Sequence, residues 1–145
     1  MRVLVCGGRK FYNKILFKRT LDLLHERRGL VPIIIGSNVS FLGADAALIP
    51  DGPITCIIQG GASGADFLGK HWAIAVACIP QEEYKMAGQG RSAGPQRNAI
   101  MLKAGRPDLV LAFGSEEKGT RGRGTNDMVK KARSARVAVM EVKDD

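Results

Sequence analysis

One stretch decides the fold of this chain: Ile54-Thr55-Cys56-Ile57-Ile58-Gln59-Gly60-Gly61-Ala62-Ser63-Gly64-Ala65-Asp66. It begins with an apolar, β-branched run, which is typical of a buried strand, and it ends by entering a helical pattern. The glycines between these two patterns permit a tight turn that presents backbone N–H groups, and the N-terminus of the following helix carries partial positive charge. This strand–turn–helix unit predicts a binding site for phosphate or another anion.

Two further glycine clusters repeat the same arrangement. Gly7-Gly8-Arg9 follows the apolar run 3–6, and Gly122-Arg123-Gly124-Thr125 follows, at a longer distance, the apolar run 109–113. In open α/β sheets, ligands bind beyond the carboxyl ends of the strands, near the switch in strand order. We therefore expect the three turns to share one cleft.

Strand-like and helix-like patterns alternate through most of the chain. The predicted strands are 2–6, 54–58, 79–84, 108–113 and 137–142, and the predicted helices are 13–28, 65–77, 95–104 and 125–135, with Asn13 and Thr125 as helix caps. This alternation predicts a single α/β domain over 1–145, a Rossmann-like three-layer α/β/α fold with a mostly parallel sheet of about five strands. Residues 30–53 interrupt the alternation, and we interpret them as an insertion that forms either a hairpin arm or an edge strand.

Composition narrows the class of protein. The 145 residues are 45% hydrophobic and 25% charged, as in an ordinary globular domain with a real core. The apolar runs are too short to span a membrane, and the N-terminus does not resemble a signal peptide, so we expect a cytoplasmic protein without a membrane partner. Three scattered cysteines and two histidines in helix-like stretches favour neither a disulfide framework nor a metal site, and we expect no bound cofactor.

The charge of the chain indicates the kind of partner. The net charge is +8, and most of the excess lies after residue 84. A phosphorylated small molecule or a nucleic acid would complement this charge, and a solvated basic face would also explain it. The Gly-Gly-x-x-Gly spacing at 60–64 differs from the G-x-G-x-x-G dinucleotide fingerprint. A Walker loop is also excluded, because Gly69-Lys70 fall inside a predicted helix and His71 replaces the required Ser or Thr.

Polar side chains beside the glycines complete the candidate site. Arg9 is either a surface cation or a bidentate phosphate ligand, and Arg97-Asn98 offer cationic and amide donors that could close over a ligand. Asp66 either stabilises the start of a helix or holds a ribose hydroxyl. Asp127 stabilises a first helical turn electrostatically, and both Asp127 and Thr125 are candidates to face the ligand. The candidate ligand-binding residues are Gly7, Gly8, Arg9, Gly60, Gly61, Ser63, Gly64, Asp66, Arg97, Asn98, Gly122, Gly124 and Thr125.

Taken together and in this order, the motifs resemble one family, the YspA-type, cpYpsA-related branch of the SLOG (SMF/DprA–LOG) superfamily. The resemblance is carried by four segments, 7–11, 60–66 with Trp72-Ala73, 93–98 with Met101, and 122–129. It implies a Rossmann-like domain that binds a nucleotide or nucleotide-derived ligand, and relatives suggest self-association, for which 30–53 could supply the surface. The Gly122–Asp127 segment is similar to the phosphate-binding loop of LOG enzymes, but it lacks their proline and carries Arg123 between its glycines.

Three functions follow as hypotheses, and the sequence leaves open whether the protein is an enzyme. The first is binding of a nucleotide or nucleotide-derived ligand in the glycine-rich cleft. The second, implied by the LOG resemblance, is hydrolysis of a nucleoside 5′-monophosphate to base and ribose phosphate, with Asp127 or Asp66 as the catalytic carboxylate beneath the ribose. The third is DNA binding, which ranks last because the aromatic content is 6% and no nucleic-acid-binding motif is present.

Overall fold

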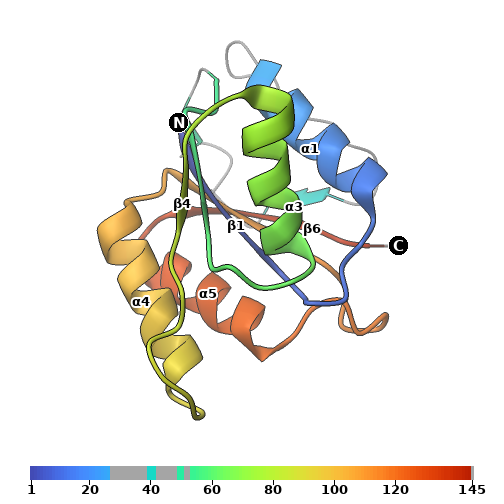
Figure 1. Ribbon diagram of the computed structural model, residues 1–145. Coiled ribbons are helices and arrows are strands. Elements are labelled where there is room, and N and C mark those ends of the chain that lie inside the picture. Colours follow the sequence, from blue (N-terminus) through green and yellow to red (C-terminus); the bar gives the residue numbers. More distant parts are fainter. Residues whose placement is uncertain (27–38, 42–48, 51–52, 145) are drawn as a thin grey trace.

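The computed structural model describes residues 1–26, 39–41, 49–50 and 53–144 of the chain, and within them it forms one sheet covered by helices (Figure 1). Six strands pair in the order β2-β6-β5-β1-β3-β4. Their bounds are β1 (Arg2–Gly7), β2 (Val39–Phe41), β3 (Cys56–Gln59), β4 (Gln81–Glu83), β5 (Leu109–Phe113) and β6 (Ala138–Val142). Five of them run parallel, and β2 pairs antiparallel with β6 at one edge. The predicted Rossmann-like, mostly parallel sheet is confirmed.

Helices cover both faces of this sheet. Their bounds are α1 (Lys14–Glu26), α3 (Ala65–His71), which continues as the π-helical segment η2 (Trp72–Ala77), α4 (Ala93–Gly105) and α5 (Arg123–Ser134). Residues of α1 and α3 pack in one apolar cluster with one face of the strands. Residues of α4 and α5 pack in a second cluster with the other face. These two cores confirm the three-layer arrangement.

The order of the strands places a switch point at the centre of the sheet. After β1 and the distant edge strand β2, the chain adds β3 and β4 on one side of β1, and it then returns to the other side of β1 to add β5 and β6. The strands β1 and β3 end toward the same side of the molecule as the N-termini of α3, α4 and α5 (Figure 1). The fold therefore gathers helix N-termini at the carboxyl ends of the strands, where ligands of such sheets bind.

The structure also tests the predicted insertion and the two predicted helix caps. Val39–Phe41 forms the antiparallel edge strand β2 within the predicted insertion. Residues 31–35, whose apolar and β-branched sequence is also typical of a strand, lie outside the described residues. Asn13 caps α1 as predicted, because its Oδ1 accepts the Leu16 N–H at 3.1 Å. The prediction that Thr125 caps a helix is wrong: α5 begins at Arg123 after the extended residue Gly122, so Thr125 lies within the first turn.

Two further observations concern the burial of the cysteines and the length and polarity of the helices. Cys6 and Cys56 are buried in β1 and β3, whereas Cys78 is exposed at the end of η2. In the part of the chain that the structure describes, every helix is too short or too polar to traverse a bilayer.

Candidate functional site

A cleft of about 790 Å³ opens at the carboxyl ends of β1 and β3. The turn after β1, the turn after β3, the loop before α4 and the first turn of α5 all contribute to its walls. Of the candidate residues, it is lined by Gly7, Gly8, Arg9, Gly60, Gly61, Ser63, Asp66, Arg97, Asn98, Gly122, Gly124 and Thr125. The three glycine turns therefore share one cleft, as their positions after parallel strands predicted.

Glycine is required where these turns touch each other. The Gly8 N–H donates to the Thr120 carbonyl at 2.8 Å, and a Cβ on Gly8 would lie 2.0 Å from that oxygen. Gly64 has a φ of +79°, and a Cβ there would lie 2.2 Å from the Gly8 carbonyl oxygen. Gly64 is thus a packing residue behind the cleft rather than part of its lining. Backbone contact between the turns fixes their positions relative to one another.

The buried side chain of Asp66 stabilises the turn after β3 by hydrogen bonds. Its Oδ2 accepts the N–H groups of Gly60 at 3.1 Å and Ala62 at 3.3 Å. The side chain is only 6% exposed. Burial raises the pKa of Asp66 to about 6, because desolvation disfavours the charged form more than the two amides and Arg97 favour it. Asp66 is the one carboxylate among the described residues of the cleft lining.

Arg97 and Asn98 tie two walls of the cleft together. The Arg97 Nη1 donates to the Gly60 carbonyl at 2.7 Å and to the Tyr84 carbonyl at 3.3 Å, while its Nε donates to Asn98 Oδ1 at 3.2 Å. Asn98, which is buried, donates from Nδ2 to the Gly124 carbonyl at 3.1 Å. The pair therefore connects the turn after β3 with the first turn of α5, through the start of α4. The sequence pattern predicts that these donors bind a ligand, but most of them form hydrogen bonds within the protein.

Asp127 lies outside the lining of the cleft. Its carboxylate accepts hydrogen bonds from Lys131 Nζ at 2.6 Å and from Asn98 Nδ2 at 3.0 Å. Although desolvation raises the pKa of Asp127, the hydrogen bonds from Lys131 and Asn98 outweigh it, and the net shift is downward. Of the two carboxylates considered for a place beneath a ribose ring, only Asp66 borders the cleft.

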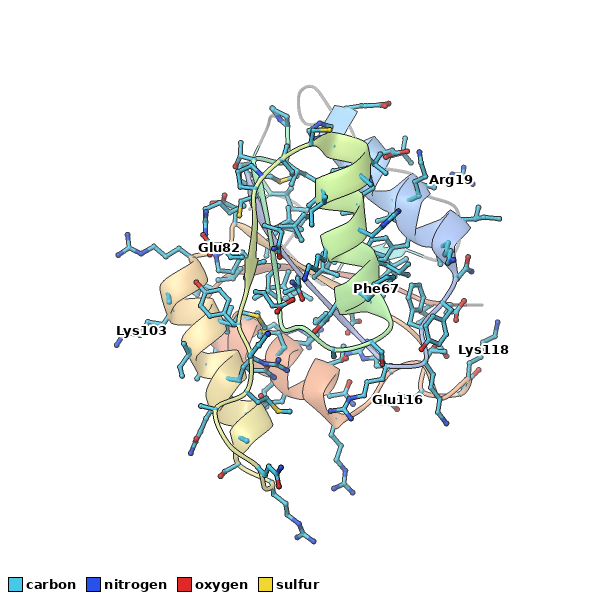
Figure 2. All side chains as sticks on the ribbon, in the orientation of Figure 1. Arg19, Phe67, Glu82, Lys103, Glu116 and Lys118 are labelled. Atoms are coloured by element: carbon cyan, nitrogen blue, oxygen red, sulfur yellow. The ribbon has the colours of Figure 1, made fainter. Side chains whose placement is uncertain are left out.

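Asp127 instead borders a second, shallow groove between α4 and α5. This groove is also lined by Lys103, Lys130 and Lys131 and by the apolar residues Leu102 and Val137. Figure 2 shows the Lys103 side chain extending outward from α4, away from the sheet. The Asn98–Asp127 hydrogen bond links the two sites, because Asn98 lines the cleft and Asp127 lines the groove.

The first turn of α5 presents unsatisfied donors to the cleft. The N–H groups of Arg123, Gly124 and Thr125 precede the first complete helical turn, and no side chain caps them in the described part of the chain. The Thr125 hydroxyl is also without a hydrogen bond among the described residues, although the side chain is only 4% exposed. The other buried polar side chains all have partners, namely Thr20, Gln59, Asp66, Asn98 and Thr120.

The cleft lining is strongly cationic. Among the described residues, it contains five basic side chains and a single carboxylate, and the basic residues are Arg9, Lys10, Lys85, Arg97 and Arg123. Lys85 lies 3.6 Å from Glu83, and Arg9, Lys10 and Arg123 have no ion-pair partner among the described residues. Four lining residues are not among the candidates predicted from the sequence, namely Lys10, Lys85, Met86 and Arg123. The glycine-rich segment 87–94 could have indicated Lys85 and Met86, because it directly follows them and leads into α4, and its residues Gly88 and Gly94 also line the cleft.

Comparison of the chain with protein-family models, with curated proteins and with solved structures found no match. Function is therefore inferred from the geometry and charge of the cleft.

Proposed function

We propose that the cleft binds a nucleotide or nucleotide-derived ligand through its phosphate. The observation that carries this proposal is the buried Thr125 hydroxyl, which lies without a hydrogen-bond partner among the described residues at the uncapped start of α5. Buried polar groups in folded proteins are almost always hydrogen-bonded, so a lone exception in a cleft is a candidate ligand contact.

A phosphate group matches this turn of α5 in charge and in hydrogen bonding. Its oxygens accept hydrogen bonds, whereas the turn offers the N–H groups of Arg123, Gly124 and Thr125 together with the Thr125 hydroxyl. The partial positive charge of the helix N-terminus favours an anion at the same place. The unpaired cations Arg9 and Lys10, on the turn after β1, add to this preference.

The remainder of the cleft has room for more than a phosphate. Its volume of about 790 Å³ is within the range of small-molecule sites. Met86 and Met101 contribute apolar surface to the lining, which suits the face of a nucleobase. The resemblance of the sequence motifs to the SLOG superfamily also favours a nucleotide over a simple anion, and membership in that superfamily is part of this proposal.

Equilibrium binding of a nucleotide panel tests the proposal. Mono-, di-, oligo- and cyclic nucleotides would be titrated into the protein by calorimetry, with the corresponding nucleosides as phosphate-free controls. We expect at least one nucleotide to bind about tenfold or more tightly than its nucleoside, because the phosphate contacts are charge-assisted. If no nucleotide binds at millimolar concentration, the proposal is wrong.

A pair of charge variants on α5 places the ligand within the molecule. Arg123→Gln removes an unpaired cation from the cleft, whereas Lys130→Gln removes the same charge from the groove between α4 and α5. We expect the first variant to weaken nucleotide binding several-fold and the second to leave it nearly unchanged. Equal losses in both variants would indicate a long-range charge effect rather than a contact in the cleft.

A further inference from the structure

The carboxylate of Asp66 is an unusual wall residue for a site that takes an anion. Its Oδ2 is occupied by the N–H groups of Gly60 and Ala62, but its Oδ1 accepts no hydrogen bond from the described residues. The side chain borders the same cleft as the first-turn N–H groups of α5 and the cations Arg9 and Lys10, which have no ion-pair partner among the described residues. A negative charge at Asp66 would therefore oppose any anion that enters.

The groups around Asp66 leave its charge only weakly stabilised. From α4, Arg97 favours the ionised form, but its Nη1 already donates to the Gly60 and Tyr84 carbonyls. From β4, Glu83 opposes ionisation, although Lys70 and Lys85 pair with Glu83 and reduce its effect.

The neighbouring group from β1 adds no compensating positive charge. Cys6 is a buried thiol, and burial raises its pKa further, so it stays neutral beside Asp66. Burial likewise places the pKa of Asp66 itself near 6. A modest further rise in this pKa therefore protonates a substantial fraction of Asp66 near neutral pH.

We propose that an anion entering the cleft causes Asp66 to take up one proton from solvent, after which its Oδ1–H donates a hydrogen bond toward the ligand. The step forms one O–H bond at Oδ1 and consumes one solvent proton, while Oδ2 continues to accept the Gly60 and Ala62 N–H groups. This inference rests on the proposed function, because it needs an anionic ligand in the cleft. It converts the one acidic residue of the lining from a repelling group into a donor.

The coupling predicts the direction and size of a pH effect on binding. A like charge nearby disfavours the carboxylate, and a rise of about one unit in the pKa of Asp66 is a conservative consequence of a bound dianion. By linkage, the affinity for the anion would then be about tenfold higher at pH 5 than at pH 8. The change would fall between the pKa of the free protein, about 6, and the higher value of the complex.

Sulfate is a suitable probe because it stays fully ionised over this pH range, so any proton taken up belongs to the protein. The Asp66 side-chain carboxyl would be followed by carbon NMR from pH 4 to 8 in sodium sulfate and in sodium chloride of equal ionic strength. The amide signals of Arg123, Gly124 and Thr125 would report occupancy of the cleft in the same samples. We expect sulfate to move these amides and to raise the titration midpoint of Asp66 by about one pH unit.

Two variants check that the coupling belongs to Asp66. Asp66→Asn keeps an oxygen acceptor for the turn and carries a permanent N–H donor, so its sulfate affinity should stay at the low-pH value throughout. Asp22→Asn alters a carboxylate on α1 that bonds Lys18 and Trp72, and it should retain the wild-type pH dependence. If Asp66→Asn does not fold, the wild-type titration alone decides.

The possible outcomes separate the two proposals. Sulfate that moves the α5 amides without moving the Asp66 midpoint would refute the proton coupling and leave the proposed function standing. Sulfate that moves none of these amides would contradict the anion site, and the coupling would fall with it.

Discussion

Thr125→Val separates ligand binding from folding at a single position. The substitution replaces a hydroxyl by a methyl group of similar size, and both residues are β-branched, so the cost of placing the side chain in α5 is nearly the same. A buried hydroxyl without a partner costs about 1–3 kcal/mol, and the Thr125 hydroxyl has none among the described residues. We therefore expect the variant to raise the free energy of unfolding by about 1 kcal/mol.

The same change should weaken phosphate binding. A hydrogen bond to a charged acceptor contributes roughly 1.5–3 kcal/mol, so loss of the hydroxyl should reduce the affinity for a nucleotide by about 10- to 100-fold. Urea unfolding measures the first quantity, and calorimetric titration with a nucleotide selected from the panel measures the second. An increase in stability accompanied by a loss of affinity is the expected signature.

Thr20→Val is the matched control for this experiment. Thr20 is also buried in a helix, but its Oγ1 donates to the Leu16 carbonyl at 2.7 Å, and it does not border the cleft. We expect this variant to lose about 1 kcal/mol of stability and to keep its nucleotide affinity. A loss of stability in Thr125→Val equal to that in Thr20→Val would show that the Thr125 hydroxyl is satisfied in the free protein, and the reasoning would fail.

Two further predictions concern the walls of the cleft. Gly64→Ala should destabilise the protein by about 3 kcal/mol or more in urea unfolding, because its Cβ would collide with the Gly8 carbonyl in addition to the strain of a φ of +79°. Gly88→Ala, which has a φ of +90° but open space around it, should lose only about 1 kcal/mol, and equal losses would exclude the collision as the cause. Asp66→Asn should match the wild type in stability near pH 4 and exceed it by about 3 kcal/mol above pH 6, because the carboxyl whose pKa is raised from 3.8 to about 6 destabilises the folded wild type progressively as the pH rises through that interval. A constant difference between the two proteins from pH 4 to 8 would contradict the burial of a charge at Asp66.

The convergence of the three turns could be predicted from the sequence because it follows from strand direction alone. The apolar runs at the start of the chain, before Gly60 and at 109–113 identify parallel strands, and each is followed by a turn at the same edge. No side-chain contact is needed for this conclusion. Strand direction does not decide between a hairpin arm and an edge strand for residues 30–53, and the structure shows an edge strand at Val39–Phe41.

The partners of individual side chains could not be predicted in this way. Arg97 bonds the carbonyl of Gly60, which is 37 positions away, and Asn98 bonds that of Gly124, which is 26 positions away. Sequence spacing contains no information on such pairs, because they depend on where the start of α4 lies relative to the turn after β3 and the first turn of α5. Cationic and amide side chains at a helix start were therefore interpreted as ligand contacts, when most of their donors connect the walls of the cleft.

The features of the free protein that an anionic ligand would affect occur together. A buried hydroxyl without a described partner, a buried carboxylate and unpaired cations all border one cleft, whereas the other buried polar side chains of the described residues are hydrogen-bonded. Local conflicts of this kind are expected at functional sites, where a ligand supplies the missing interactions. A structural explanation would have to account for each conflict separately, while one bound phosphate accounts for the hydroxyl, the free amides and the cations at once. The carboxylate is the one feature that an anion aggravates, and its protonation removes that remaining conflict.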